Sequence, residues 1–281
     1  MLDHKLRKRG IGSSEIAMLI TNNGRPLSPW GGPHKLWRRK TDRELDKPTA
    51  IMQRGRYIEE AILSWYADTV GVIERPGTIR HPQLDFVVDS VDAVREGVCC
   101  VEAKTVHWSQ HSKWGKPGTD EIPLYYSTQC QWHCGVHGLP YCDIPIDTGT
   151  DFKLYCVEFE HNTFEQMVNI ARVFWFDHIV SGVEPALDMD RDTSQWLSHN
   201  TTNASNAVRD ATPDEIALLR EYRRVRIAKE SLPELEVRIK DAIGDLSGLR
   251  IPGTTARVTH KTTKKGNRRL YAKPLIDSEE I

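Results

Sequence analysis

The chain lacks any run of eighteen apolar residues, and hydrophobic residues make up 39% of its 281 positions. A helix that crosses a bilayer needs about 20 consecutive apolar residues, so the sequence predicts no membrane-spanning helix and no membrane partner. The first ten residues, MLDHKLRKRG, are charged and have no apolar segment, which argues against a secretory signal. We therefore expect a cytoplasmic protein in which the six cysteines are reduced thiols.

Internal repeats and motifs that bind nucleotide phosphates are also missing. The sequence contains neither GxxxxGK[ST] nor GxGxxG, the glycine-rich loops that cradle phosphate groups. The chain therefore has no visible ATP-driven motor. Any processivity on a long substrate would therefore have to come from the shape of the protein, such as a ring that encircles that substrate.

An excess of charge of one sign is absent as well, because 38 Lys and Arg residues nearly balance 39 Asp and Glu residues. The basic residues are nevertheless segregated. They gather at residues 5–9 and 35–43, and residues 257–273 contain seven Lys or Arg and no acid. Local basic patches on a neutral protein fit a nucleic-acid partner, although a solvated face is the commoner meaning of any single patch.

The hydrophobic pattern predicts helices and strands in mixed order. Helices are expected near residues 13–21, 33–41, 51–70, 123–138 and 162–182, and strands near residues 86–93, 98–106, 141–147 and 152–159. A helix between the second and third of these strands points to an α/β or α+β domain around one sheet. We expect this domain to occupy residues 1–190.

The C-terminal part differs in composition. Residues 191–211 are predicted to form a linker, because the stretch WLSHNTTNASNAVRDA is polar and rich in turn-forming residues. The appendage that follows, residues 212–281, opens on TPDE, a strong helix start in which Thr212 is the N-cap and Glu215 closes a capping box. We expect a charged helix to about residue 247, kinked or split at Pro233.

Two short strands near residues 254–261 and 267–272 are expected to form a basic hairpin around KKGN. Its Lys and Arg residues are interleaved with Thr and Tyr, as in a strand pair that contacts phosphates. A solvated basic hairpin is the alternative interpretation.

One predicted strand ends in an acid and a base. In VCCVEAKT, Glu102 and Lys104 are two residues apart and therefore project to the same side of the strand. Upstream, Asp92 lies in VVDSVDAV, and the turn signal in AVREGV allows a hairpin that brings Asp92 beside Glu102. Two carboxylates and a lysine that converge in this way suit a Mg²⁺ ion, which would activate a water. For an isolated Glu-x-Lys, a structural ion pair is the commoner explanation.

Two helical segments supply further polar residues. In QRGRYIEEAILSWYADTVG, Glu59 flanks the apolar stripe, whereas Glu60 points toward solvent. In PLYYSTQCQWHCGVHG, Tyr126, Gln129 and His133 share one helical face at i, i+3 and i+7. The glutamine could hold a phosphate or a water, and an ordinary amphipathic helix is the alternative.

The same segment contains four residues that look like zinc ligands: Cys130, His133, Cys134 and His137. One straight helix cannot arrange four ligands tetrahedrally around a zinc ion, so we do not expect a zinc site there. Cys99 and Cys100 are expected to be strand residues packed in the core.

Taken in order, RGRYIEEAI, SVDAV, VEAKT and YYSTQCQWHCGVHG resemble the motifs of the YqaJ-type viral recombinase nucleases, relatives of lambda exonuclease in the PD-(D/E)XK superfamily. The stretches LRKRGIGSSEIAMLI and SPWGGPHKLWRRKTD fit the N-terminal segment of the same family. The resemblance covers about residues 6–190. It implies a restriction-endonuclease-like α/β (α+β) core, with a central mixed sheet flanked by helices and the C-terminal helix and basic hairpin as an appendage.

The resemblance also implies two sets of site residues. The catalytic set comprises the carboxylates, lysine and glutamine of the motifs: Glu59, Asp92, Glu102, Lys104 and Gln129. Of these, Asp92 and Glu102 would bind Mg²⁺, for which Mn²⁺ can substitute. The second set falls where lambda exonuclease binds the 5′-phosphate of DNA and where an aromatic residue lines its site: Arg7, Ser14 and Tyr126.

Two positions depart from the family pattern. Ala93 stands where the family has a glycine after the central Asp. Lambda exonuclease also has another active-site acid shortly before that Asp, whereas the corresponding stretch here reads RHPQ, which leaves His81 or no residue in its place. The departures concern the ligands of the metal and do not change the implied reaction class.

The implied function is a Mg²⁺-dependent DNA exonuclease of the phage recombination type, acting in the cytoplasm of a bacterial host. It would start at double-stranded DNA ends, degrade the 5′-ended strand, and leave a 3′ strand for a single-strand annealing protein. Because lambda exonuclease is a trimeric ring, a homo-oligomer is expected. The alternatives are a structure-specific or restriction-like endonuclease on the same core and a catalytically degenerate DNA-binding module. The intact Asp92, Glu102 and Lys104 argue against the latter.

Overall fold

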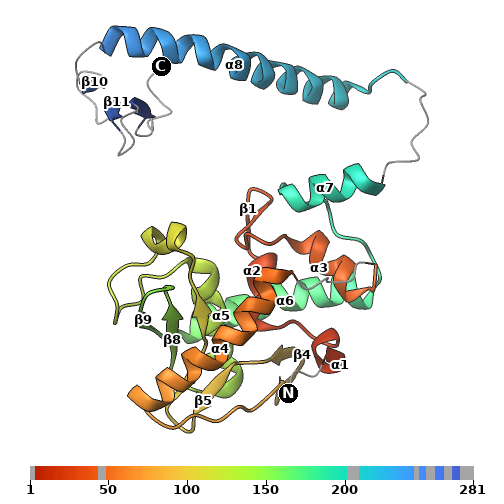
Figure 1. Cartoon of the computed structure of the whole chain (residues 1–281). Helices are drawn as coiled ribbons and strands as arrows, with labels where there is room; N and C mark the ends of the chain where they lie inside the picture. Colours follow the sequence, from red (N-terminus) through yellow and green to blue (C-terminus); the bar gives the residue numbers. More distant parts are fainter. Residues whose placement is uncertain are drawn as a thin grey trace. The chain divides into compact units, whose positions relative to one another are not determined.

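The computed structural model describes residues 4–43, 49–200, 209–243, 247–250, 257–262 and 268–272. The chain divides into two compact units, residues 1–204 and residues 205–281, whose elements are shown in Figure 1. Across these described ranges, every helix is too short or too polar to span a membrane.

The first unit is built around a five-stranded mixed sheet in the order β5-β6-β8-β7, with β9 also paired to β8. The strands are β5 (Ala93–Arg95), β6 (Cys99–Val101), β7 (Lys104–Thr105), β8 (Tyr141–Asp147) and β9 (Phe152–Glu158). β6 and β7 run parallel to β8, whereas β5 pairs antiparallel with β6 and β9 pairs antiparallel with β8. A parallel pair needs a long crossover connection, and helix α5 (Leu124–His137) lies in it.

One helix packs on each face of this sheet (Figure 1). On one face, Tyr66 of α4 (Ala50–Thr69) packs with Cys99. On the other face, Cys134 of α5 packs with Cys100. Consecutive strand residues point to opposite faces, so these two neighbouring cysteines belong to different layers of the core. The predicted helices near 51–70 and 123–138 are confirmed, as is the burial of both cysteines.

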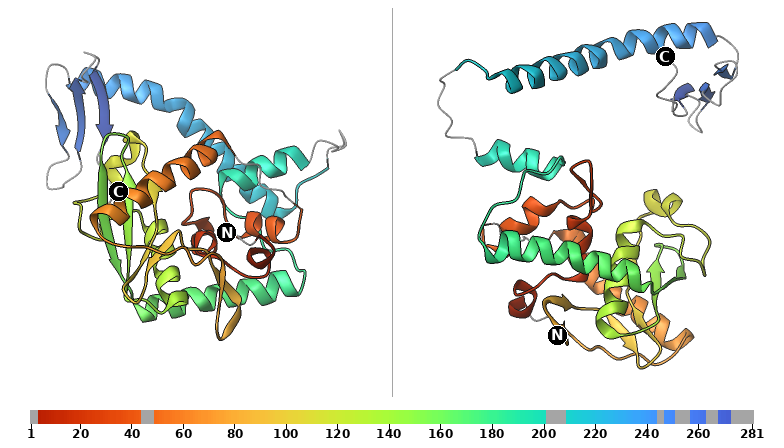
Figure 2. Two further views of the ribbon diagram at one scale, coloured as in Figure 1. Left: turned by 60° about the horizontal axis from the view of Figure 1, so that its bottom comes forward. Right: turned by 180° about the vertical axis from the view of Figure 1, so that it is seen from behind.

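The remaining elements of the first unit surround the central layer. They are α1 (His4–Lys8), α2 (Ser13–Leu19), β1 (Thr21–Asn22), β2 (Arg25–Pro26), α3 (Pro33–Lys40), β3 (Ile79–His81), β4 (Leu84–Asp89), the 3-10 helix η1 (Trp108–Lys113), α6 (His161–Phe174), the π-helix η2 (Trp175–Val180) and α7 (Arg191–Asn200). Figure 2 shows α6, in green, lying across the back of this unit. Its apolar face packs with α2, α3 and α5 around Trp37 and Trp132. The helices predicted near 13–21, 33–41 and 162–182 are therefore confirmed.

Two predicted strands are interrupted in the structure. The strand predicted at residues 86–93 is in fact two, because β4 ends at Asp89 and pairs with β3, whereas β5 begins at Ala93 and pairs with β6. Residues 98–106 also form two strands, since Glu102 and Ala103 separate β6 from β7. The backbone N–H of Glu102 donates to the carbonyl of Asp143 in β8 at 3.0 Å, which keeps the chain in place across the gap. Hydrophobic alternation runs through both breaks and therefore could not reveal them.

Residues 191–200, the first part of the predicted linker, form helix α7 instead. Asp192 of this helix pairs with Lys35 at 2.8 Å and with Arg38 at 2.7 Å, both on α3. The Arg38 guanidinium also lies 4.9 Å from the ring centre of Trp196. The partners that hold α7 are distant in the sequence. Local composition could not reveal them, and the turn-rich residues therefore suggested a linker. Residues 201–208 of that linker lie outside the described residues.

The second unit contains one long helix, α8 (Pro213–Ile243). Its predicted capping box is confirmed, because the N–H of Thr212 donates to Glu215 Oε2 at 2.8 Å and the N–H of Glu215 donates to Thr212 Oγ1 at 3.3 Å. α8 continues through Pro233 without the predicted split and ends before the predicted residue 247.

A three-stranded antiparallel sheet completes the second unit. It consists of β10 (Gly248–Arg250), β11 (Arg257–Thr262) and β12 (Arg268–Ala272). β11 and β12 are the predicted hairpin, and β10 adds a strand that the sequence did not predict. The turn KKGN, residues 264–267, lies outside the described residues.

Candidate active site

The acid and base of VEAKT lie at the interruption between β6 and β7. Lys104 Nζ donates a hydrogen bond to Glu102 Oε1, which agrees with the expected alternation along the strand. Asp92 Oδ2 accepts a hydrogen bond from the backbone N–H of Ala103 at 2.9 Å. This bond extends the β5–β6 hairpin, in which Ala93 pairs with Val101, by one further residue. The structure therefore brings Asp92, Glu102 and Lys104 together.

Helix α5 presents three side chains to this group. Gln129 Nε2 donates a hydrogen bond to Glu102 Oε1 at 2.5 Å. His133 Nε2 lies 3.2 Å from the other oxygen of the same carboxylate, Oε2. Lys104 Nζ also lies over the ring of Tyr126, 5.0 Å from its centre. The face formed by positions i, i+3 and i+7 is thus directed at the strand ends, and Gln129 holds a carboxylate.

A second buried acid, which the sequence reasoning missed, lies behind Glu102. Asp89, the last residue of β4, is 1% exposed. Its Oδ2 accepts hydrogen bonds from His133 Nδ1 at 2.7 Å and from His137 Nε2 at 3.1 Å. Burial opposes a charge on His133, but the carboxylates of Asp89 and Glu102 outweigh it and raise the pKa of His133 well above its usual value. A cation therefore lies between two buried anions.

The sequence did contain a signal for this arrangement. VVDSVDAV carries two aspartates, and the first follows an apolar run as directly as the second. His133 and His137 also lie one and two turns after Gln129 on the same helix. By contrast, His81, the candidate for the missing acid, stacks on Phe164 with ring centres 6.2 Å apart.

Glu59 and Glu60, adjacent on α4, have different surroundings. Glu59 is partly buried, and burial raises its pKa; Arg75 opposes this shift and the Glu102 carboxylate adds to it. The Glu60 side chain is 66% exposed and accepts two hydrogen bonds from Arg75, at 2.7 and 2.9 Å. Glu59 therefore lies close enough to Glu102 and Lys104 for their charges to affect its pKa.

The two carboxyl groups beside Lys104 differ in their tendency to ionise. Despite burial, Lys104 and His133 lower the pKa of Glu102 to about 2, so this carboxyl is ionised. Burial and then the Glu102 carboxylate raise the pKa of Asp92 well above its usual value. Burial opposes the charge of Lys104, but Glu102 and Asp92 outweigh it and raise the pKa of the lysine. Despite Lys104, Asp92 therefore favours its protonated form, and a divalent cation beside it would favour the ionised one.

The donor set fits Mg²⁺. Glu102 Oε2 is buried, and apart from His133 Nε2, which lies 3.2 Å away, it has no polar partner among the described residues. Asp92 adds a second carboxylate, and carboxylate oxygens are ligands that Mg²⁺ prefers. Among the residues that the structure describes, no three His, Cys, Asp or Glu side chains are arranged to hold a metal ion. Water and substrate oxygens would therefore complete the shell, as is common for Mg²⁺.

Arg7 and Ser14 form a separate polar pair, in which the Arg7 guanidinium donates to Ser14 Oγ at 3.2 Å. Lys40 of α3 holds the intervening loop. Its ammonium donates to the carbonyls of Arg7 and Gly10 at 2.7 Å each and pairs with Glu15 at 2.7 Å. The Lys40 side chain is 4% exposed, so a buried ion pair fixes the backbone that carries Arg7.

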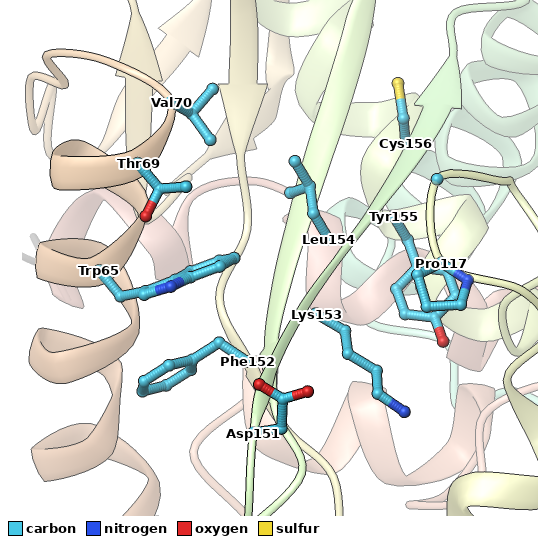
Figure 3. Close-up of a pocket in the computed structure, with 11 residues that line it drawn as sticks. Trp65, Thr69, Val70, Pro117, Asp151, Phe152, Lys153, Leu154, Tyr155 and Cys156 are labelled. Atoms are coloured by element: carbon cyan, nitrogen blue, oxygen red, sulfur yellow. The ribbon is translucent and has the colours of Figure 1, made fainter.

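A pocket of about 600 Å³ lies along β9, and the residues of the carboxylate group do not line it (Figure 3). Two of its lining residues, Trp65 of α4 and Phe152, stack with ring centres 5.2 Å apart. Lys153 and Tyr155 line it from β9 itself. The candidate active site around Asp92, Glu102 and Lys104 is therefore separate from this pocket.

Comparison with known proteins shows which proteins this chain is similar to. Residues 4–140 match the family model of the YqaJ-like viral recombinase domain. The uncharacterized protein YqaJ of Bacillus subtilis (strain 168) is 24% identical over 244 residues, which cover 84% of this chain and 73% of that protein. The resemblance inferred from the sequence motifs is confirmed.

Solved structures agree on the fold. The alkaline exonuclease LHK-Exo of Laribacter hongkongensis matches with a TM-score of 0.51 at 16% identity, over 72% of this chain and 97% of that one. LHK-Exo in complex with dAMP matches with a TM-score of 0.52 at 15% identity, over 71% and 96% of the two chains. The predicted fold, a central mixed sheet flanked by helices, is confirmed.

Proposed function

We propose that this chain, whose residues 4–140 match the family model of the YqaJ-like viral recombinase domain, is a Mg²⁺-dependent DNA exonuclease. The observation that carries the proposal is the convergence of Asp92, Glu102 and Lys104 at the gap between β6 and β7. By its resemblance to lambda exonuclease, the enzyme degrades the 5′-ended strand of linear duplex DNA and leaves a 3′ strand.

In this proposal Asp92 and Glu102 hold the metal. Mg²⁺, when bound, supplies Lewis acidity and lowers the pKa of a water that attacks phosphorus. Lys104 keeps its proton and stabilises the charge that develops on the phosphate. Gln129 fixes the Glu102 carboxylate in place through its hydrogen bond.

The test is digestion of a linear duplex labelled at the 5′ or the 3′ end, with Mg²⁺, with Mn²⁺, or with neither. We expect early release of the 5′ label, retention of the 3′ label on long strands, and no release without metal. A covalently closed duplex of the same sequence should stay intact. Cleavage of that closed duplex would instead indicate a structure-specific or restriction-like endonuclease. Binding of both duplexes without cleavage would indicate a degenerate DNA-binding module.

Glu59→Gln should slow cleavage about 10- to 100-fold, the usual cost of losing a group that supports a metal centre. Glu60→Gln is the matched control and should leave the rate unchanged, because Glu60 is exposed and pairs with Arg75. Single-turnover rates on one 5′-labelled duplex measure both. Equal effects of the two substitutions would contradict the assignment of Glu59 to the site.

Arg7→Ala should remove a preference for 5′-phosphorylated ends over 5′-hydroxyl ends. In the wild type we expect that preference to be about tenfold or more, since a hydrogen bond to a charged group contributes about 1.5–3 kcal/mol. The ratio of initial rates on the two substrates measures it. Arg9→Ala, at an exposed residue of the same basic stretch, should keep the ratio. A ratio that Arg7→Ala does not change would refute the assignment of the phosphate to Arg7 and Ser14.

The resemblance also supports proposals about partners. We propose that three copies form a ring around the duplex, which would keep the enzyme on its substrate, and that a single-strand annealing protein receives the 3′ strand. Sedimentation at a mass of three protomers would support the ring, and a monomer at all concentrations would oppose it.

A further inference from the structure

Three aromatic rings meet beside Lys104. Trp30, in the loop between β2 and α3, has its ring centre 5.2 Å from that of Tyr125, with the planes nearly perpendicular at 82°. It is also 6.0 Å from the ring centre of Tyr126. The two tyrosine rings are 4.4 Å apart. Because Tyr126 contacts Lys104, the cluster adjoins the candidate active site.

The cluster is buried at one end and open at the other. Trp114, which is 8% exposed, packs behind Tyr126 with ring centres 5.7 Å apart. Trp30, by contrast, is 54% exposed. Tryptophan is large and mostly apolar, so a ring left half in water next to a site is a surface that a ligand can cover.

The loop holds Trp30 in this exposed position. Its backbone N–H donates to Ser28 Oγ at 3.1 Å, and its carbonyl accepts from Lys35 Nζ at 3.0 Å. Gly31 follows with φ of +127°, and a Cβ there would lie 2.5 Å from the Lys35 side chain. The loop is therefore built for one conformation, in which the indole is presented beside Tyr125.

We propose that Trp30 and Tyr125 form a stacking surface for the base of the nucleotide next to the scissile phosphate. The inference rests on the proposed exonuclease function, which requires a phosphate at Lys104. Every base has an aromatic face, so stacking accepts any sequence, as an exonuclease must. A base inside a duplex already stacks on its neighbours, so the surface takes an unpaired terminal nucleotide. The preferred substrate is therefore a duplex with a frayed or short single-stranded 5′ end.

The test compares binding of two duplexes by the full chain without divalent metal, so that no cleavage occurs. One carries a normal unpaired 5′-terminal nucleotide, and the other carries an abasic residue there. We expect the wild type to bind the abasic duplex about five- to a hundredfold more weakly, the usual effect of losing one stacked base. Trp30→Ala should bind both equally, and Trp30→Phe, which keeps a ring, should recover part of the difference.

Trp108→Ala is the matched control, because Trp108 is also an exposed tryptophan, and its ring contact is with His107. It should keep the full difference between the two duplexes. Equal affinities in the wild type, or the same loss with Trp108→Ala, would overturn the proposal. Failure of the wild type to cleave any DNA with metal would refute the proposed function itself. Cleavage without discrimination against the abasic end would refute only the stacking surface.

Discussion

Lys104→Ala will abolish cleavage, lowering the rate about a hundredfold or more, the usual loss when a group that stabilises transition-state charge is removed. Lys104 is the cation that bonds Glu102, and Asp92 and Glu102 together raise its pKa. Without it, the ammonium that stabilises the charge developing on the phosphate is lost. Binding of duplex DNA without metal should stay nearly intact, because most contacts to DNA lie along its backbone away from the scissile bond.

Lys153 provides the matched control for this substitution. β7, β8 and β9 lie side by side, with Lys104 opposite Ile146 and Ile146 opposite Lys153, so both lysines project from the same face. Lys153 lines the separate pocket along β9 (Figure 3). Lys153→Ala should therefore cleave at the wild-type rate. A folded Lys104→Ala protein with near wild-type activity would show that the active site has been assigned wrongly.

His133→Ala will destabilise the fold by about 3–5 kcal/mol, the usual cost of removing one partner from a buried charge pair. The substitution strips Asp89 of its closest partner and takes the nearest cation from Glu102 Oε2. Asp89 Oδ1 already has no hydrogen-bond partner, so the protein has little left to compensate with. Urea denaturation followed by tryptophan fluorescence measures the change in the free energy of unfolding.

Substitutions of two further histidines serve as comparisons for the destabilisation expected from His133→Ala. His137→Ala removes the weaker, 3.1 Å partner of Asp89 and should cost less. His161→Ala removes an exposed pair with Glu165 and should cost no more than about 1 kcal/mol. Combining Asp89→Asn with His133→Gln, which replaces the charges by neutral hydrogen-bonding groups, should recover part of the stability. A cost below about 1 kcal/mol for His133→Ala would mean that the buried charges do not depend on one another.

The periodic parts of the chain could be predicted from the sequence, because each depends on local patterns. The apolar stripe of α4 predicted which face of the helix packs on the sheet. It also predicted that Glu59, and not Glu60, lies toward the candidate active site. The spacing of Gln129 and His133 predicted that they share one face of α5, and in the structure that face contacts the Glu102 carboxylate. Capping chemistry likewise identified the start of α8 at Thr212.

Features that depend on long-range contacts were not visible in the same patterns. The role of Asp89 exists only because α5 crosses behind β4, which brings His133 from 44 residues away. Helix α7 is set by Asp192 reaching Lys35 and Arg38, more than 150 positions earlier in the chain. The break between β6 and β7 at Glu102 and Ala103 is also invisible to strand alternation, which continues through it.

The two neighbouring cysteines in β6 point to opposite faces of the sheet, so their reaction with alkylating reagents can report local unfolding on each face separately. The five buried thiols, Cys99, Cys100, Cys130, Cys134 and Cys142, are closed to alkylating reagents while the sheet layers remain packed. A reagent reaches such a thiol only during local or global unfolding, so the modification rate reports the free energy of that opening. Cys99 belongs to the layer under α4 and Cys100 to the layer under α5. Fragmentation of the alkylated peptides by mass spectrometry assigns the label to Cys99 or to Cys100. Timed alkylation would therefore tell which helix separates from the sheet first, and whether an inactive variant has a disrupted core.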